Sequence, residues 1–336
     1  DENRVTEIIC DEGDRTIGYT YDVIGRIATR TANGWKTSYP TTYQYLAPEN
    51  GDSIQTTPLV QSITQNGQNF SYTYDNVGNI TSVTRNGLTT TYVYDKLGQL
   101  IRENDPHANK TTVYNYDRGG NILSCVEYAY TTGTLGAATQ TTAYTYGDSN
   151  WKDKVTAIGG KTITYDAIGN PLTYDGWTFT WKAGRMLASM VKSGTNAQFT
   201  YDHNGLRIKK VVNGVTTNYT LNGKNVVHMT QGSHDLHFFY DAQGKPGMVT
   251  YNDVDYFYVY NLQGDVVALI DADGTQVVEY VYNAWGNPIS KTGSLAATIG
   301  TLNPFRYRGY VYDEETGLYY LRSRYYNPVW KRFINA

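Results

Sequence analysis

The chain carries the stretch Tyr-Asp-Asn-Val-Gly-Asn at residues 74–79 and Tyr-Asp-Lys-Leu-Gly-Gln at residues 94–99. The shared phrase Tyr-Asp-x-x-Gly recurs along the sequence. Complete copies place its tyrosine, aspartate and glycine at Tyr21, Asp22 and Gly25; Tyr74, Asp75 and Gly78; Tyr94, Asp95 and Gly98; Tyr165, Asp166 and Gly169; Tyr201, Asp202 and Gly205; and Tyr240, Asp241 and Gly244. Looser copies begin at Tyr116, Tyr260, Tyr282 and Tyr312. A period of roughly 20 residues indicates an array of one supersecondary unit, in which each copy buries its face on its neighbours.

The residues before each turn alternate between aromatic and polar or β-branched types. Phe70, Tyr72 and Tyr74 are spaced two apart, which is the strand period, so their rings share one face of a sheet. Thr, Val and Ile fill the positions between such rings and favour strand. The chain has 33 Tyr but only 8 Phe, and a ring with a polar end suits a half-buried face.

Two kinds of turn separate the predicted strands. In the repeat phrase, the aspartate can accept backbone N–H groups, and the glycine supplies a positive φ. A second kind falls about half a period later, at Asn33-Gly34, Asn66-Gly67, Asn86-Gly87, Asn213-Gly214 and Asn222-Gly223. We expect Asp273-Gly274 to act in the same way.

Each repeat is therefore predicted to be two strands of about six or seven residues with a turn at each end. Degenerate copies of the repeat, in which the Tyr-Asp-x-x-Gly phrase is incomplete, fill the gaps in the period at residues 43–45, 144–147, 181–185 and 220–223. The predicted fold class is all-β, an array of hairpins that forms one long, curved and spiralling sheet. No segment shows a sustained helical period.

The last residues have a different rhythm. We divide the chain into the hairpin array at residues 1–302 and a terminal hairpin at residues 303–336, with an Asp-Glu-Glu-Thr-Gly turn at 313–317. The expected first strand places Arg306, Arg308, Tyr310 and Tyr312 on one face, and the second places Arg322 and Arg324 together. Stacking of guanidinium groups on phenol rings would interlock this hairpin with its surroundings. Its further characteristic residues are Gly317, Tyr319, Tyr320, Tyr325 and Tyr326.

With these motifs the chain resembles the YD repeats of the Rhs family, and residues 303–336 resemble the Rhs core-associated region that ends such arrays. The resemblance implies a β-sheet strip that spirals into a partial or complete hollow shell, with the terminal hairpin as a cap or plug. In that family, which includes bacterial cell-wall-associated proteins, insecticidal toxin-complex subunits and teneurins, the shell encloses a variable C-terminal polypeptide, commonly a toxin. The implied partners are such a cargo polypeptide or the rest of the shell. The implied location is secreted or on the bacterial cell surface.

The sequence departs from the family pattern near its end. Family members usually continue into an aspartate-containing motif that performs self-cleavage, whereas this chain stops at residues 332–336, so we assign no catalytic residue and expect no enzyme activity. Lys331 stands where the family usually has glycine, and Asn327 where it often has aspartate. Arg332 matches the arginine that precedes the cleavage region. The opening residues, Asp1 and Glu2, suggest a fragment or a processed piece.

The charge and the apolar runs of the sequence argue against several classes of binding partner. A net charge of −3 gives no reason to expect a nucleic-acid or anionic-membrane partner. The longest apolar runs, such as residues 266–270, fall far short of the roughly 18 residues that a membrane helix needs. No catalytic triad context is visible, and we expect no cofactor.

Three groups of residues could hold a ligand, but each has a simpler interpretation. The repeat aspartates are spread too widely for calcium loops, which favours turn capping. His228, His234 and His237 could bind a metal, yet residues 232–235 have the composition of a turn, which favours a solvated loop. Glu314 and Glu315 are adjacent and therefore do not suit a glycosidase pair.

The alternative function is binding of cell-surface carbohydrate or adhesion through exposed aromatic rings. The candidate tryptophans are Trp35, Trp151, Trp177, Trp181, Trp285 and Trp330. The tyrosines recur in register with the repeat, which favours a structural role for the aromatic residues.

Overall fold

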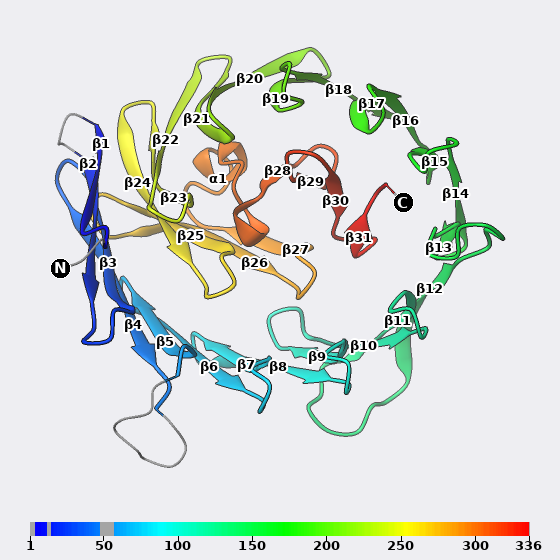
Figure 1. Cartoon of the computed structure of the whole chain (residues 1–336), viewed down its shortest axis with the longest axis horizontal. Helices are drawn as coiled ribbons and strands as arrows, with labels where there is room; N and C mark the ends of the chain where they lie inside the picture. The colour runs from blue at the N-terminus through cyan, green and yellow to red at the C-terminus, as the bar shows by residue number, and fades with distance from the viewer. Residues whose placement is uncertain (1–3, 12–14, 48–56, 336) are drawn as a thin grey trace.

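The computed structural model describes residues 4–11, 15–47 and 57–335. Its main element is a sheet of 27 strands in which each strand pairs antiparallel with the next one in sequence. The sheet is not closed by a bond between its first and last strands in the described part of the chain. It winds as a spiral strip, so its last strands lie inside its first ones (Figure 1). This confirms the predicted all-β array of hairpins.

The first part of the strip comprises β1 Glu7–Asp11, β2 Arg15–Tyr21, β3 Ile27–Asn33, β4 Ser38–Tyr45, β5 Val60–Gln65, β6 Gln68–Tyr74, β7 Ile80–Arg85, β8 Leu88–Tyr94 and β9 Leu100–Asp105. The middle part comprises β10 Lys110–Tyr116, β11 Ile122–Ala129, β12 Ala138–Thr145, β13 Ala157–Ile158, β14 Lys161–Tyr165, β15 Pro171–Tyr174, β16 Trp177–Lys182, β17 Met186–Lys192 and β18 Thr195–Tyr201. The last part comprises β19 Arg207–Val212, β20 Val215–Asn222, β21 Asn225–Gln231, β22 His234–Tyr240, β23 Pro246–Tyr251, β24 Val254–Tyr260, β25 Val266–Asp271, β26 Gln276–Tyr282 and β27 Pro288–Thr292.

A short helix α1, Ile299–Leu302, and a 3₁₀ turn η1, Tyr307–Gly309, follow the large sheet. A second sheet of four strands ends the chain, with β28 Val311–Asp313, β29 Leu318–Tyr320, β30 Tyr325–Asn327 and β31 Arg332–Phe333. In the described residues, no helix has the length and apolar character that a membrane crossing requires.

The repeat turns have the chemistry that their sequence predicts. In the second complete copy, the Asp75 carboxylate accepts the backbone N–H groups of Val77 and Asn79 at 3.0 and 2.8 Å, and Gly78 has a φ of 87°. The same pair of bonds, to the second and fourth residues after the aspartate, recurs at Asp22, Asp95, Asp117, Asp166, Asp202 and Asp241. The carboxylates therefore act as turn caps.

The second set of turns is confirmed at Asn66, Asn86 and Asn213, which have φ between 45° and 51° and precede a glycine with positive φ. The prediction for Asp273-Gly274 is wrong. Asp271 accepts the N–H groups of Asp273 and Thr275 at 3.0 and 2.9 Å, so this turn belongs to the aspartate-capped kind.

A bulge beside each repeat tyrosine links one repeat to the next. Tyr74 pairs with Ile80 across a register shift, and the Ile80 carbonyl accepts the hydroxyl of Tyr94 at 2.9 Å. The bulge leaves a ladder carbonyl available for this bond. Equivalent bonds join Tyr45 to Ile27, Tyr116 to Leu100, Tyr201 to Leu187, Tyr240 to Val226, Tyr260 to Pro246 and Tyr282 to Val266. Successive repeats are thus joined through hydroxyl groups, and this explains why the repeat uses tyrosine.

One of the degenerate copies keeps the same bond with a different donor. Trp181 sits at a bulge opposite Leu187, and its indole N–H donates to the Pro171 carbonyl at 2.7 Å. Residues 181–185 are therefore a repeat turn in which tryptophan replaces tyrosine.

The strip overlaps itself where β23–β26 pass inside β2–β9 (Figure 1). On β24, Phe257 and Val259 pack in a core with Ile17, Phe70 and Tyr72 of the outer layer. The alternate residues Tyr256 and Tyr258 face a second core that includes the end of the chain. Both faces of β23, β24 and β25 are therefore buried, which explains the unbroken apolar run at residues 266–270.

Polar bonds fix the register of this overlap. The N–H groups of Ala242 and Leu262, in two inner turns, donate to the hydroxyls of Tyr19 and Tyr72, each at 2.9 Å. Arg30 is buried and lies 3.0 Å from the Asp241 carboxylate, so this repeat aspartate both caps its turn and pairs across the layers. Removal of one member of such a buried pair is costly because the other charge is left without its partner.

Backbone conformation at the repeat glycine can be tested at Gly98. It has a φ of 74°, and a Cβ added there would meet no atom within 4 Å. We therefore expect Gly98→Ala to destabilise the protein by about 1–2 kcal/mol through the left-handed backbone alone. The measurement is the urea midpoint. Gly136→Ala is the matched control, because Gly136 also has open space but no positive φ. Equal midpoints for the two variants would contradict the turn assignment.

Candidate functional site: the terminal segment inside the spiral

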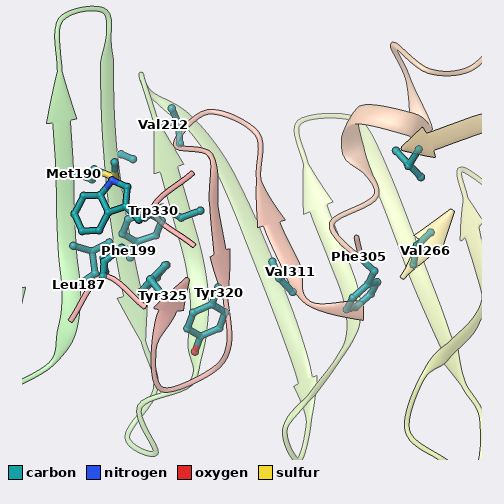
Figure 2. Close-up of a cluster of buried hydrophobic side chains, with 14 of the residues drawn as sticks. Leu187, Met190, Phe199, Val212, Val266, Phe305, Val311, Tyr320, Tyr325 and Trp330 are labelled. Atoms are coloured by element: carbon teal, nitrogen blue, oxygen red, sulfur yellow. The ribbon is translucent and has the colours of Figure 1, made fainter. Parts of the chain in front are cut away.

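The terminal segment, residues 303–335, lies within the curve of the large sheet (Figure 1). Its side chains complete the core on the concave face. Figure 2 shows Trp330 and Tyr325 beside Leu187 and Phe199 of the wall, and Phe305 near Val266. Trp330 is only 1 % exposed and meets Tyr174 edge to face at 4.7 Å. The sheet therefore wraps around its own C-terminal segment.

The predicted arginine and tyrosine strands are only partly correct. A hairpin does flank the 313–317 turn, but its strands are limited to β28 and β29. Arg306 and Arg308 precede β28 and do not share a strand face with Tyr312. The chain cannot stay extended there, because Arg308 and Gly309 adopt φ of 56° and 68°. Arg322 also has a positive φ, in the connection between β29 and β30.

A buried charge cluster joins the hairpin to the wall. Asp313 is 0 % exposed, and its two oxygens accept from the Arg207 guanidinium at 2.6 and 3.0 Å. Lys210 lies 3.2 Å from the same carboxylate and 2.8 Å from Glu315. Burial opposes the charged form, but Arg207 and Lys210 outweigh it and hold the pKa of Asp313 below its usual range.

Arg207 is also enclosed by rings. Its guanidinium lies 4.6 Å from the centre of the Tyr320 ring and 5.3 Å from that of Phe199. Its backbone N–H donates to the Tyr320 hydroxyl at 2.9 Å. The predicted stacking of cations on phenol rings is present here, although the arginine comes from the wall and the tyrosine from the terminal segment.

Three tyrosines of the terminal segment bind one turn of the sheet. Their hydroxyls donate to three successive carbonyls between β26 and β27. The bonds are Tyr307 to Ala284 at 2.9 Å, Tyr326 to Trp285 at 2.9 Å and Tyr319 to Gly286 at 2.8 Å. A Cβ on Gly286 would lie 2.4 Å from the Tyr307 ring, so this turn requires glycine. The recurring tyrosines of this region are hydrogen-bond donors that dock it.

Arg306 attaches the beginning of the terminal segment to the large sheet. It is buried, lies 4.1 Å from the Tyr280 ring centre and donates to the Gly300 carbonyl at 2.6 Å. Its own carbonyl accepts the N–H of Val266 at 3.1 Å. This arginine therefore joins the segment to both β25 and β26.

The last residues follow the inner wall. Lys331 has a φ of 59°, which gives a physical reason for the glycine that the family usually has there. Asn327 accepts the N–H groups of Val329 and Trp330 at 2.9 and 3.1 Å, a role that aspartate fills equally well. Arg332 donates to the Tyr146 hydroxyl and to the Asp153 carbonyl. Its contacts are those of an anchor.

Glu103 is a buried carboxylate that the sequence analysis did not single out. It accepts the N–H of Ala284 at 2.8 Å and the hydroxyl of Tyr114 at 3.0 Å. Ala284 occupies the same place in its turn as Ala242 and Leu262, so Glu103 replaces a tyrosine hydroxyl as the acceptor. Burial, and then the charge of Asp105, raise the pKa of Glu103 to about 7.

Cavities remain between the terminal segment and the wall. One of about 560 Å³ lies between β6–β9 and β25–β26, with Tyr307 and Arg308 in its lining. Another of about 450 Å³ is lined by Tyr146, Trp285 and Arg332. The concave side is therefore incompletely filled by the described residues.

The other candidate residues are separated by the fold. Glu314 pairs with Lys291 and Arg306, whereas Glu315 pairs with Lys210. They do not form one site.

The candidate tryptophans differ in burial. Trp330 is in the core, and Trp35, at 72 % exposed, is the one of the six that appears among the exposed large apolar side chains. The other four are partly buried, so the six tryptophans do not form one exposed surface.

The prediction of a solvated loop for the histidines is wrong. His228 lies on β21, and His234 and His237 lie on β22. Residues 232 and 233 alone form the turn between these strands.

A hairpin strip coiled around its own C-terminal segment defines a β-sheet shell. The family model described as Teneurin YD-shell matches residues 65–336 of this chain. The chain belongs to this YD-shell family, and the resemblance to YD-repeat proteins is confirmed. It is 37 % identical over 238 residues to the tRNA3(Ser)-specific nuclease WapA of Bacillus spizizenii, a match that covers 68 % of this chain and 10 % of WapA.

Solved toxin-complex structures have the same fold. The crystal structure of TcdB2-TccC3 superposes with a TM-score of 0.68 at 19 % identity, covering 96 % of this chain and 20 % of that one. The TcdB2-TccC3 structure without its hypervariable C-terminal region gives a TM-score of 0.66 at 19 % identity and covers 96 % and 19 %. The chain spans about a tenth of the curated relative and about a fifth of these solved chains.

Acid should weaken the docking of the terminal segment through Asp313. Because its folded-state pKa is depressed, its contribution is present above the unfolded value near 3.9 and is lost as the pH falls through the lower folded value. We expect Asp313→Asn to cost about 3–5 kcal/mol near neutral pH, since Arg207 is left buried without its partner. Urea midpoints measured against pH will show this, with the exposed Asp273→Asn as control. A double variant, R207M with D313L, should recover most of the loss, and no recovery would contradict the assignment of that loss to charge burial.

We expect the contribution of Glu103 to stability to have the opposite pH dependence. Its folded pKa is raised to about 7, so its contribution is present below its unfolded value of 4.5 and is lost as the pH rises through about 7. Glu103→Gln keeps an acceptor for Ala284 and should therefore stabilise the protein at about pH 8 but not at about pH 5. Urea midpoints at the two pH values test this, with Glu127→Gln as control. Destabilisation of equal size at both pH values would contradict the raised pKa.

Proposed function

We propose that this chain is a non-enzymatic encapsulating scaffold, a shell segment of a secreted or cell-surface Rhs-type toxin protein, and that it encloses a C-terminal cargo polypeptide. The observation that carries the proposal is the position of the two ends: the N-terminal strands lie on the outside of the spiral and the C-terminal strand lies within it (Figure 1). A polypeptide joined after residue 335 would begin on the concave side.

The contacts of the terminal segment support this role. Asp313, Tyr319 and Arg332 hold the segment to three separate parts of the wall. The last described residues are also held, since the Asn335 side chain donates to Asn170 at 2.7 Å. Such anchoring fixes where a following cargo would enter the interior.

We further propose the division after residue 302. The large sheet ends with β27 at Thr292, and the second sheet begins with β28 at Val311. The segment before this boundary would form the wall, and the segment after it the plug. Toxic activity in a parent protein would then reside in the enclosed polypeptide, in keeping with relatives that are named nucleases and of which this chain matches a tenth.

Enclosure can be tested by protease access. An unstructured polypeptide is fused either after residue 336 or before residue 1, and each fusion is digested with proteinase K. We expect the C-terminal extension to be cut at least roughly fivefold more slowly, because the wall restricts access to it while the N-terminal extension is outside. Equal rates in intact, folded protein would contradict enclosure.

A further inference from the structure

Three potential metal ligands, His228, Asp235 and His237, lie on one hairpin of the wall. The hairpin is formed by β21 and β22 (Figure 1). His228 lies directly opposite His237 in the strand register, and Asp235 precedes His237 by two residues on the same face. The buried residues Met229, Leu236 and Phe238 alternate with these three. The histidines and the aspartate therefore project from the convex face, away from the core.

The potential ligand atoms of these three residues already lie close to one another. The Nε2 atom of His228 lies 3.0 Å from one Asp235 oxygen, and the Nε2 atom of His237 lies 2.9 Å from the other. The two imidazole rings are stacked, with centroids 4.2 Å apart and planes 15° apart. All three ligand atoms lie within 4.8 Å of one another.

The separation of these ligand atoms is close to the separation of ligand atoms around a bound transition metal. With metal–nitrogen and metal–oxygen distances near 2.0–2.2 Å, tetrahedral ligand atoms are separated by about 3.3 Å. The ion would take one carboxylate oxygen, whereas the two Nε2 atoms now lie against different oxygens, so the Asp235 carboxylate or the His237 ring would have to turn to bring all three ligand atoms to this separation. His237 is more than half exposed, so its ring has room to turn.

The neighbouring hairpin, β23–β24, holds the backbone of Asp235 in place. The Asp235 N–H donates to the Asn252 side chain at 2.9 Å, and the Asn252 N–H donates back to the Asp235 carbonyl at 3.0 Å. A carboxylate and two imidazoles form a donor set that suits zinc better than calcium or magnesium.

His234 is excluded from this group, although it belongs to the same strand. Its Nδ1 atom lies 2.8 Å from the Tyr251 hydroxyl. It faces a different neighbour and provides a histidine on the same hairpin that should not contribute to binding.

We propose that His228, Asp235 and His237 form a binding site for a divalent transition metal of the zinc type on the convex face of the shell. The ion is coordinated by the Nε2 atoms of both rings and by one carboxylate oxygen. Each ring then carries its remaining proton on Nδ1, and any second ring proton passes to solvent. Three protein ligands leave a coordination position that faces outward, open to water or to a donor from another molecule. The ion would clamp β21 to β22.

The test is titration of the untagged, chelator-treated chain with ZnCl₂ by calorimetry and with CoCl₂ by absorption spectroscopy. We expect saturable binding, visible Co²⁺ bands and no comparable response to CaCl₂ or MgCl₂. His237→Ala and Asp235→Asn should each weaken zinc binding by more than about 10-fold. His234→Ala is the matched control and should leave the affinity within about twofold of wild type.

Circular dichroism of each variant checks that the fold is intact. His237→Ala is the decisive variant, because its exposed side chain can be removed without opening the core. Zinc binding that is unchanged in His237→Ala and Asp235→Asn would overturn the proposal. So would an equal loss of binding in His234→Ala, or the absence of any response to zinc or cobalt in the intact chain.

Discussion

A single sheet has two faces, and this protein must cover the apolar one without a second sheet of comparable size. The concave face carries the aromatic residues of nearly every repeat, and removal of that surface from water is the main favourable term available to the fold. The chain covers it in two ways. Its inner strands, β23–β26, lie against the first strands of the strip, and its terminal segment fills much of the remaining concavity. The spiral shape is a consequence of this requirement together with the twist of the sheet.

The repeat is built so that such a strip can continue over many strands. Each aspartate-capped turn fixes the length of a hairpin, and the bulge beside the tyrosine presents a carbonyl to the next repeat, as between Ile80 and Tyr94. Because the link is a hydroxyl bond from a half-buried ring, the wall can curve without a thick core. The terminal segment uses the same chemistry, since Tyr307, Tyr319 and Tyr326 dock through their hydroxyls. A surplus of tyrosine over phenylalanine is thus explained in both parts of the chain.

Much of the fold could be predicted from the sequence because its information is local. Residues close in sequence determine the aspartate cap at Asp75 and the positive φ of Gly78. They also allow the degenerate repeat around Trp181 to be recognised. The overlap of layers could not be predicted, because it joins residues about 200 positions apart, such as Arg30 and Asp241. One local signal was available: the unbroken apolar run at 266–270 is typical of a strand buried on both faces. Three other features could not be predicted without the register of the assembled sheet. They are the pairing of Arg207 with Asp313, the burial of Glu103, and the proximity of His228 to Asp235.

Hydrogen exchange of the intact chain, resolved by strand, tests the account of a self-covered sheet most directly. If β23–β25 are enclosed between the outer layer and the terminal segment, their amides will exchange most slowly in the molecule, more slowly than those of β12 and β16, whose exposed residues outnumber their buried ones. Rapid exchange in β23–β25, or the same rate along the whole strip, would show that the inner strands are not covered on both faces and would contradict the central claim.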